Sequence, residues 1–156
     1  MTKAVFPGSF DPITVGHLDI IKRAAAVFDE VTVSILENPG KGCEFTVEQR
    51  LELIRDAVAG IPNVTVCADT GLLVDHCRRI GARVIVRGIR SGADVEYEAT
   101  LEQVNSRIAP EIATVYLISK PEHAHISSSL VRQLIKIGIG IDGLVPNADH
   151  TLFRRV

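Results

Sequence analysis

One stretch near the start of the chain combines the residue types that phosphate chemistry needs: Phe6-Pro7-Gly8-Ser9-Phe10-Asp11-Pro12-Ile13-Thr14-Val15-Gly16-His17. An apolar run precedes a turn rich in glycine and proline, and apolar residues then recur at helical spacing, which predicts a strand, a tight turn and a helix. Thr14 is a candidate N-cap, which places His17 at the third helical position. Backbone N–H groups at a helix start attract phosphate, and an imidazole there can donate to a phosphoryl oxygen. The alternative interpretation is a well-capped helix with a surface histidine.

The same stretch resembles the first motif of the nucleotidyltransferase superfamily. The resemblance rests on Gly8-Ser9-Phe10-Asp11-Pro12 followed by Thr14-Val15-Gly16-His17. That superfamily includes cytidylyltransferases, nicotinate-mononucleotide adenylyltransferases and class I aminoacyl-tRNA synthetases.

Length and composition limit the possible classes of protein. The chain has 156 residues, which predicts a single domain over 1–156, and a formal net charge of −2, which gives no global attraction to nucleic acid or membrane. No apolar run reaches the length of a membrane span, and the N-terminus lacks a signal-peptide pattern. Cys43, Cys67 and Cys77 are odd in number and widely spaced, which disfavours disulfides and a zinc site. We therefore expect a cytoplasmic protein.

Strand and helix patterns alternate along the whole chain. Strands are expected at 4–6, 31–36, 64–67, 84–86 and 114–118, and helices at 14–28, 46–59, 72–80, 94–108 and 127–137, with a short one near 148. Thr46 with Gln49 fits a capping box, and Gly81 a helix end. This alternation predicts the α/β class: a single Rossmann-like domain whose five-stranded parallel sheet carries helices on both faces.

Residues suited to phosphate binding follow every predicted strand. They are Gly8 to Asp11, Lys41, Gly71, Arg87 to Arg90, and the loop from His123 to Ser129. Ligands of open parallel sheets lie outside the carboxyl ends of the strands, so these groups are predicted to converge on one edge. This convergence carries more weight than any single motif.

Three of these candidates have alternative structural roles. Arg87 and Arg90 flank Gly88, where guanidinium groups can bind phosphate in two-point fashion, or else pair with Asp94, Glu96 or Glu98. Lys41 lies between two glycines and suits a phosphate clamp, although a lone surface lysine often has no such role. The serines at 127–129 can cap a helix, present donors to a polyphosphate, or do both.

Other patterns are set aside. Residues 138–143 spell GxGxxG, but a helix precedes them where a dinucleotide site requires a strand, so a helix-ending turn is predicted. His123 and His125 have no third metal ligand at suitable spacing. His76 beside Cys77 is interpreted as a packing residue. We identify no Ser–His–Asp set and no Walker-type phosphate loop in the sequence.

Several motifs in order resemble the bacterial phosphopantetheine adenylyltransferases over nearly the whole chain. They are Phe45-Thr46 with Glu48 and Arg50; Arg87-Gly88-Ile89-Arg90 running to Asp94, Glu96-Tyr97-Glu98 and Asn105; and Ile126-Ser127-Ser128-Ser129-Leu130-Val131. The chain departs from many members at Ser9, His123 and Gln133.

The resemblance implies a role for each matching residue. ATP would contact Ser9, Phe10, His17, Gly88, Ile89, Arg90, Glu98, His123, Ala124, His125, Ile126, Ser127, Ser128 and Ser129. The second substrate, 4′-phosphopantetheine, would contact Ser9, Lys41, Leu73, Arg87 and Asn105. His17 would stabilise the transition state, with Lys41 and Arg90 assisting.

The resemblance also implies the reaction and its partners. ATP and 4′-phosphopantetheine would give dephospho-coenzyme A and pyrophosphate, the penultimate step of coenzyme A synthesis. Mg²⁺ would be held mainly by the ATP phosphates and water, coenzyme A would inhibit, and the chain would form hexamers. Two alternatives stay open: a related nucleotidyltransferase, such as a cytidylyltransferase or nicotinate-mononucleotide adenylyltransferase, and a non-catalytic nucleotide-binding protein like the universal stress proteins.

Overall fold

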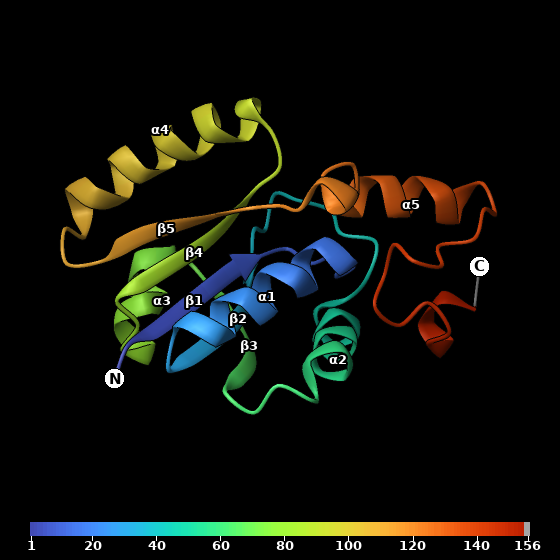
Figure 1. Ribbon diagram of the computed structural model, residues 1–156, viewed down its shortest axis with the longest axis horizontal. Coiled ribbons are helices and arrows are strands. Elements are labelled where there is room, and N and C mark those ends of the chain that lie inside the picture. The colour runs from blue at the N-terminus through green and yellow to red at the C-terminus, as the bar shows by residue number, and fades with distance from the viewer. Residues whose placement is uncertain (155–156) are drawn as a thin grey trace.

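A computed structural model describes residues 1–154 of the chain as alternating strands and helices (Figure 1). The strands are β1 (Lys3–Gly8), β2 (Glu30–Glu37), β3 (Val64–Thr70), β4 (Val84–Ile89) and β5 (Ala113–Ile118). The helices are α1 (Val15–Val27), α2 (Val47–Val58), α3 (Leu73–Ile80), α4 (Gly92–Ile108) and α5 (Ser128–Lys136), with short 3₁₀ turns at Pro121–His123 and Thr151–Phe153. The last two residues of the predicted 1–156 domain lie outside the described residues.

The strands form one parallel sheet in the order β3-β2-β1-β4-β5. The chain builds outward from β1 to β3 and then returns to place β4 on the other side of β1. The order of the sheet therefore reverses between β1 and β4, which is where open parallel sheets bind ligands. This arrangement confirms the predicted five-stranded α/β fold.

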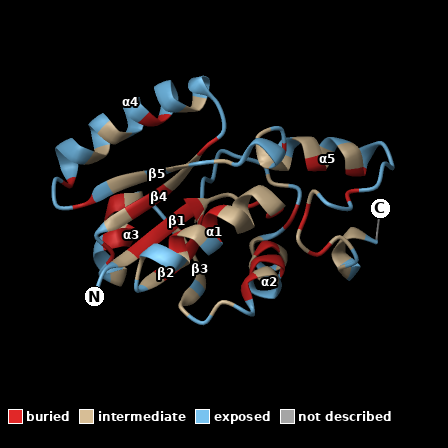
Figure 2. Ribbon diagram, viewed as in Figure 1, coloured by how far each residue is buried: buried red, intermediate tan, exposed pale blue. Residues whose placement is uncertain are grey.

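Apolar side chains cover both faces of the sheet, as predicted. On one face α1 and α2 pack Ile21 and Leu53 against strand residues such as Val33, all fully buried. On the opposite face α3 packs Cys77 against Ile85 of β4. Figure 2 shows the buried positions concentrated along the central strands, whereas α4 is largely exposed.

A third apolar cluster fixes α5 and the C-terminal segment beside the sheet. Val131 and Ile135 of α5 pack with Phe45 from the loop before α2 and with Val145 from the tail. The backbone N–H of Val15 donates to a carbonyl of that tail, at Leu144, over 2.9 Å. The beginning of α1 is thus held between the sheet and the C-terminal segment (Figure 1).

Capping residues and glycines in the sequence correctly marked several helix ends. Thr14 and Thr46 cap α1 and α2 with the predicted geometry, and Gly81 ends α3 in the left-handed conformation with φ of 72°. Gly138, with φ of 73°, follows the end of α5, so residues 138–143 begin after a helix as expected. None of the helices within residues 1–154 is long and apolar enough to cross a membrane.

Two sequence-based boundaries were wrong. β4 was expected to end at Val86, but it continues through Ile89, because Arg87 and Gly88 pair with Tyr116 and Leu117 of β5. The charged Arg87 and the glycine Gly88 are untypical of a buried strand, so the sequence pattern did not predict one here. In the structure Glu98 of α4 pairs with the Arg87 guanidinium. The expected helix near residue 148 is the 3₁₀ turn Thr151–Phe153.

Candidate active site

A cleft of about 610 Å³ opens at the carboxyl edge of the sheet, between the loops that follow β1 and β4 and the start of α5. Most of the predicted site residues line it. They are Ser9, Phe10, His17, Lys41, Leu73, Arg87, Gly88, Arg90, Glu98, His123, Ile126, Ser127, Ser128 and Ser129. Residues from five separate parts of the chain therefore meet in one cavity, as the strand-end rule predicts.

His17 is held in a defined orientation by the cap of its own helix. The backbone N–H of Thr14 donates to Nδ1 of His17 over 3.0 Å, and the Thr14 hydroxyl oxygen accepts from the backbone N–H of His17 over 3.3 Å. Because Nδ1 accepts, the ring proton of neutral His17 lies on Nε2. His17 is therefore a fixed hydrogen-bond donor in the wall of the cleft.

The surroundings of His17 keep it uncharged. Burial, and secondarily the positive charge of Arg90, lower the pKa of His17 to about 4. The imidazole is therefore neutral at physiological pH. A neutral imidazole can still donate a hydrogen bond from Nε2–H to an oxygen on which negative charge develops.

The ring of Phe10 packs against the imidazole of His17. The Phe10 ring lies edge-on to the rings of His17 and Phe6, with centroids 5.0 and 5.4 Å away. Its φ is 47°, a left-handed conformation that is uncommon for a phenylalanine and frequent at functional sites. A Cβ on Gly8 would lie 3.1 Å from the Phe10 ring, so a larger residue there would displace it. Phe10 is 3% exposed, and it acts chiefly as packing for the cleft wall.

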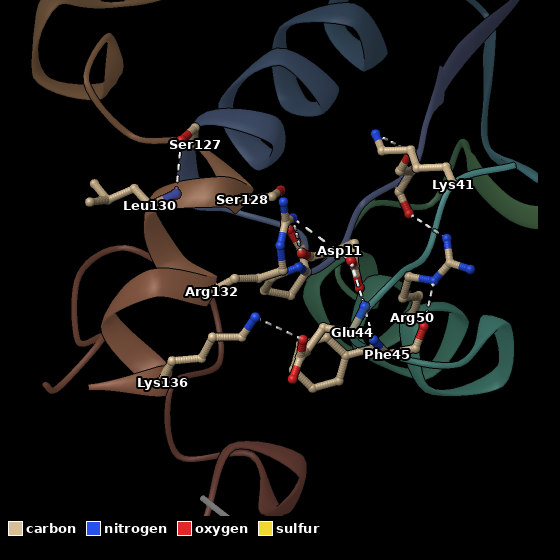
Figure 3. A network of polar contacts seen from close by, with 12 residues as sticks. Asp11, Lys41, Glu44, Phe45, Arg50, Ser127, Ser128, Leu130, Arg132 and Lys136 are labelled. Carbon is tan, nitrogen blue, oxygen red and sulfur yellow. Dashed lines mark hydrogen bonds and ion pairs between the residues drawn. The ribbon is translucent and has the colours of Figure 1, made fainter. Parts of the chain in front are cut away.

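The loop after β1 is tied to the segment before α2 (Figure 3). Both carboxylate oxygens of Asp11 accept backbone N–H bonds, from Glu44 and Phe45, each over 2.9 Å. Arg50, which is 5% exposed, donates to the carbonyl of Ser9 over 2.8 Å. The loop that carries the cleft residues is thus fixed before any ligand arrives.

The start of α5 is bonded to the same loop. Ser127 caps α5 by accepting from the N–H of Leu130, and Ser128 donates to the carbonyl of Pro12 over 2.7 Å. Arg132 donates to the carbonyl of Asp11 over 2.8 Å (Figure 3). One serine therefore caps the helix and a second anchors it, while all three line the cleft.

Arg87 is engaged by an acidic residue of α4. Its Nε donates to Oε2 of Glu98 over 2.9 Å, and its Nη2 to Oε1 over 2.6 Å. This two-point pair lies in the cleft wall, where Glu98 is only 7% exposed. The structural alternative weighed for Arg87 is therefore present, and it coexists with a position beside the cleft.

Arg90 and Lys41 line the cleft from two different loops, those after β4 and β2. The side chain of Arg90 is 44% exposed and lies 3.6 Å from Asp94, and its Nη1 reaches the carbonyl of Ile126 at 3.5 Å. Lys41 Nζ donates to the Ser9 hydroxyl over 3.3 Å. Both cations are held by weak, exposed contacts that an anionic ligand can replace.

Four predicted residues lie elsewhere. The side chain of Ile89 is buried in the fold, and Ala124 and His125 are not among the residues that line the cleft. Ile89 is buried because β4 extends through it. Asn105 lies on α4 in a smaller cavity that adjoins the cleft and also includes Leu73.

Sequence reasoning missed Arg132 as part of the site, and it placed Asp11 at the binding edge without predicting its partners. Both line the cleft, and Arg132 brings a cation to the first turns of α5. The signal was available for Arg132, because it follows Ser128 by one helical turn and so shares its face. For Asp11 the partners lie 33 and 34 residues away, which local patterns do not reveal.

The structure also contains a Ser–His–Asp set that was not recognised in the sequence. His76 Nε2 lies 2.8 Å from the Ser34 hydroxyl, and His76 Nδ1 lies 2.5 Å from Asp69. Arg79, then the N–H of Thr70 and His76 lower the pKa of Asp69 to about 2. Ser34 is fully buried beneath α3, so the set joins β2, β3 and α3 as a structural network and has no accessible nucleophile.

Comparison with known proteins places this site in a family. The cytidylyltransferase-like family matches residues 5–134. The chain is 56% identical, over 94% of its length and 90% of the relative's, to phosphopantetheine adenylyltransferase of Symbiobacterium thermophilum. It is 48% identical, over 96% and 94%, to phosphopantetheine adenylyltransferase of a Nocardioides species. The chain belongs to the phosphopantetheine adenylyltransferase family. Its enzymes are nucleotidyltransferases, in agreement with the resemblance seen in the sequence.

The fold recurs in a solved structure of low sequence identity. A crystal structure of a bifunctional NMN adenylyltransferase/ADP ribose pyrophosphatase from Francisella tularensis aligns with a TM-score of 0.72 at 19% identity. The alignment covers 98% of this chain and 51% of the other, so the chain spans about half the length of that protein. The chain thus shares its Rossmann-like fold with part of that protein.

Proposed function

We propose that the chain transfers the adenylyl group of ATP to 4′-phosphopantetheine, giving dephospho-coenzyme A and pyrophosphate. The observation that carries the proposal is the meeting of His17, Lys41, Arg90 and the start of α5 in one cleft. Two anionic reactants need such a set of donors and cations, since phosphoryl chemistry depends mainly on positioning and charge stabilisation. The names of the relatives with 43–56% identity support this choice of substrates.

The acceptor phosphate needs no general base. The second pKa of a phosphate monoester is near 6, so the group is largely dianionic at neutral pH. One of its oxygens attacks the α-phosphorus of ATP, and the bond from that phosphorus to the pyrophosphate oxygen breaks. Lys41 and Arg87 are suited to the incoming phosphate, because Lys41 is bonded to Ser9 and Arg87 shares the adjoining cavity with Leu73.

His17 would stabilise the charge that develops at the α-phosphate. Its Nε2–H is the free donor of the ring, since Nδ1 is occupied by Thr14. Arg90 and the N-terminus of α5, with Ser127 to Ser129, would receive the β- and γ-phosphates. Donors that are fixed before the reaction lower the barrier without reorganising during it.

Mg²⁺ is proposed to enter with ATP. Mg²⁺ keeps several waters and commonly binds through substrate phosphates, whose charge it partly neutralises. Within residues 1–154 no cluster of three His, Cys, Asp or Glu side chains forms a separate metal site. Both carboxylate oxygens of the cleft residue Asp11 are occupied by backbone N–H groups. In this proposal the ion is held mainly by the nucleotide phosphates and water.

The remaining expectations concern assembly, regulation and location. Exposed apolar residues recur along α4 at Tyr97, Leu101, Val104 and Ile108, which supports a homo-oligomer, with the hexamer of related enzymes as our proposal. Coenzyme A contains the pantetheine arm and the adenylyl group of the product, so it would compete for the same cleft. Cys43, Cys67 and Cys77 are free thiols, which supports a cytoplasmic location.

One assay tests the function against its alternatives. Purified protein is given Mg-ATP or Mg-CTP with 4′-phosphopantetheine or nicotinate mononucleotide, and pyrophosphate is measured over time. We expect pyrophosphate only with ATP and 4′-phosphopantetheine together, with dephospho-coenzyme A formed in equal amount. Turnover with CTP or the mononucleotide would assign a related transferase. ATP binding without pyrophosphate release would assign a non-catalytic nucleotide-binding protein.

A further inference from the structure

A second, smaller cavity of about 50 Å³ extends the cleft under α4. It shares Leu73, Arg87 and Glu98 with the cleft, and its far end lies between α4 and strands β4 and β5. Ile85 and Leu101 make its wall largely apolar. A ligand whose phosphate is held near Arg87 can therefore pass a flexible arm past Leu73 into this cavity.

The wall of this cavity contains a carboxylate oxygen without a partner. Oε1 of Glu102 accepts from the hydroxyl of Ser106 over 2.7 Å, one helical turn away on α4. Oε2 of Glu102 is buried and has no hydrogen-bond partner among residues 1–154. The Ser106 bond fixes the carboxylate, so Oε2 keeps its place in the wall.

An unpaired buried acceptor is unfavourable, because it has lost water without gaining a donor. Two of the neighbouring donor side chains are engaged elsewhere, and Asn105 and Thr114 complete the polar part of the cavity wall. The two guanidinium donors of Arg87 nearest to α4 bind Glu98, and the Tyr116 hydroxyl donates to the carbonyl of Glu98 over 3.4 Å. The geometry leaves a place for a donor brought by the ligand.

We propose that Oε2 of Glu102 accepts a hydrogen bond from an amide N–H of the pantetheine arm, making Glu102 a specificity residue for the acceptor. This inference depends on the proposed function, which supplies the ligand. The arm carries two amide N–H groups separated by methylene groups, which matches a cavity that combines apolar walls with the unpaired acceptor of Glu102. A carboxylate also disfavours acceptors that place a negative charge at this point.

The test combines variants of Glu102 with altered ligands. Binding of 4′-phosphopantetheine and of two analogues, each N-methylated at one amide nitrogen, is measured by calorimetry on wild type, Glu102→Ala and Glu102→Gln. We expect Glu102→Ala to raise the Kd of 4′-phosphopantetheine about five- to tenfold, with Glu102→Gln intermediate and the Kd of ATP unchanged. One N-methyl analogue should bind the wild type about fivefold more weakly than 4′-phosphopantetheine does. On Glu102→Ala the same analogue and 4′-phosphopantetheine should have equal Kd values.

Controls separate this inference from folding effects and from the proposed function. Glu96 lies on the same helix with an exposed side chain, so Glu96→Ala should leave the Kd of 4′-phosphopantetheine unchanged. Glu102→Ala should change Tm little, because it removes only the exposed bond between Oε1 and Ser106, while Oε2 has no partner to lose in the ligand-free protein. The inference is overturned if N-methylation weakens wild type and Glu102→Ala equally at both positions. Absence of adenylyl transfer by wild type would instead contradict the proposed function.

Discussion

The backbone N–H of Thr14 donates to Nδ1 of His17 over 3.0 Å, within the first turn of α1. The bond satisfies a donor that the helix leaves unpaired, and it also fixes the histidine tautomer. The same bond therefore caps the helix and presents Nε2–H as the donor that the proposed catalytic role of His17 needs. The charge state of His17 follows from its place in the cleft wall beside Arg90.

The depressed pKa of His17 has a direct spectroscopic consequence. Histidine in an unfolded chain titrates near 6.5, whereas the pKa of His17 in the folded protein is about 4. We expect the ring signals of His17, followed by NMR in the ligand-free protein, to stay constant from pH 8 to about 5.5. A midpoint near 6.5 would contradict the neutral-donor assignment.

The same pKa difference affects stability, with a defined sign. As pH falls below about 6.5, His17 becomes protonated in the unfolded chain. In the folded protein it becomes protonated only near pH 4. The free energy of unfolding should therefore decrease across this window and stop decreasing, for this group, below pH 4. Urea unfolding at several pH values should show a smaller decrease for His17→Asn. An equal decrease in both proteins would rule out His17 as the group responsible.

Arg87 is predicted to have two roles: it stabilises the fold through its pair with Glu98, and it binds the phosphate of 4′-phosphopantetheine. Arg87→Ala should weaken 4′-phosphopantetheine binding, leave ATP binding nearly intact and lower stability by about 1.5–3 kcal/mol, because Glu98 loses its partner. Calorimetry and urea unfolding measure the two effects separately.

The double variant Arg87→Ala/Glu98→Ala provides the control for Arg87. Removing both charges should restore part of the lost stability without restoring 4′-phosphopantetheine binding. Recovery of binding along with stability would show that Arg87 has only a structural role. Equal losses of affinity for ATP and 4′-phosphopantetheine in Arg87→Ala would contradict the division of roles.

The Ser34–His76–Asp69 network is predicted to act on stability alone. His76→Phe leaves the buried Ser34 hydroxyl without this partner and should cost about 1–3 kcal/mol in unfolding experiments. A double-mutant cycle with Ser34→Ala should give a coupling of about 1 kcal/mol. The kcat should stay unchanged, since none of the three residues lines the cleft. A large loss of kcat at unchanged stability would assign the set a chemical role.

Much of the fold follows from local sequence patterns. The strands and helices, the caps at Thr14 and Thr46, and the turn at Gly81 are encoded within a few residues of where they form. The strand-end rule then brings the cleft residues together, because every parallel strand points its carboxyl end to the same edge. The general location of the site was predictable for that reason.

What the sequence concealed depends on partners far along the chain. β4 extends through Ile89 because Arg87 and Gly88 pair with Tyr116 and Leu117 of β5, much later in the chain. Ser34 and His76 are 42 residues apart, and their contact arises only when α3 packs over β2. Spacing rules describe neighbours on one element and do not describe such pairs.

The central claim is that a neutral His17 stabilises charge on the transferring phosphate. It is tested most directly by the steady-state kinetics of His17→Ala with Mg-ATP and 4′-phosphopantetheine. We predict a decrease in kcat of roughly 10²–10³-fold with KM for both substrates changed little, since the donor acts mainly in the transition state. An unchanged kcat, or a loss confined to KM, would contradict the account.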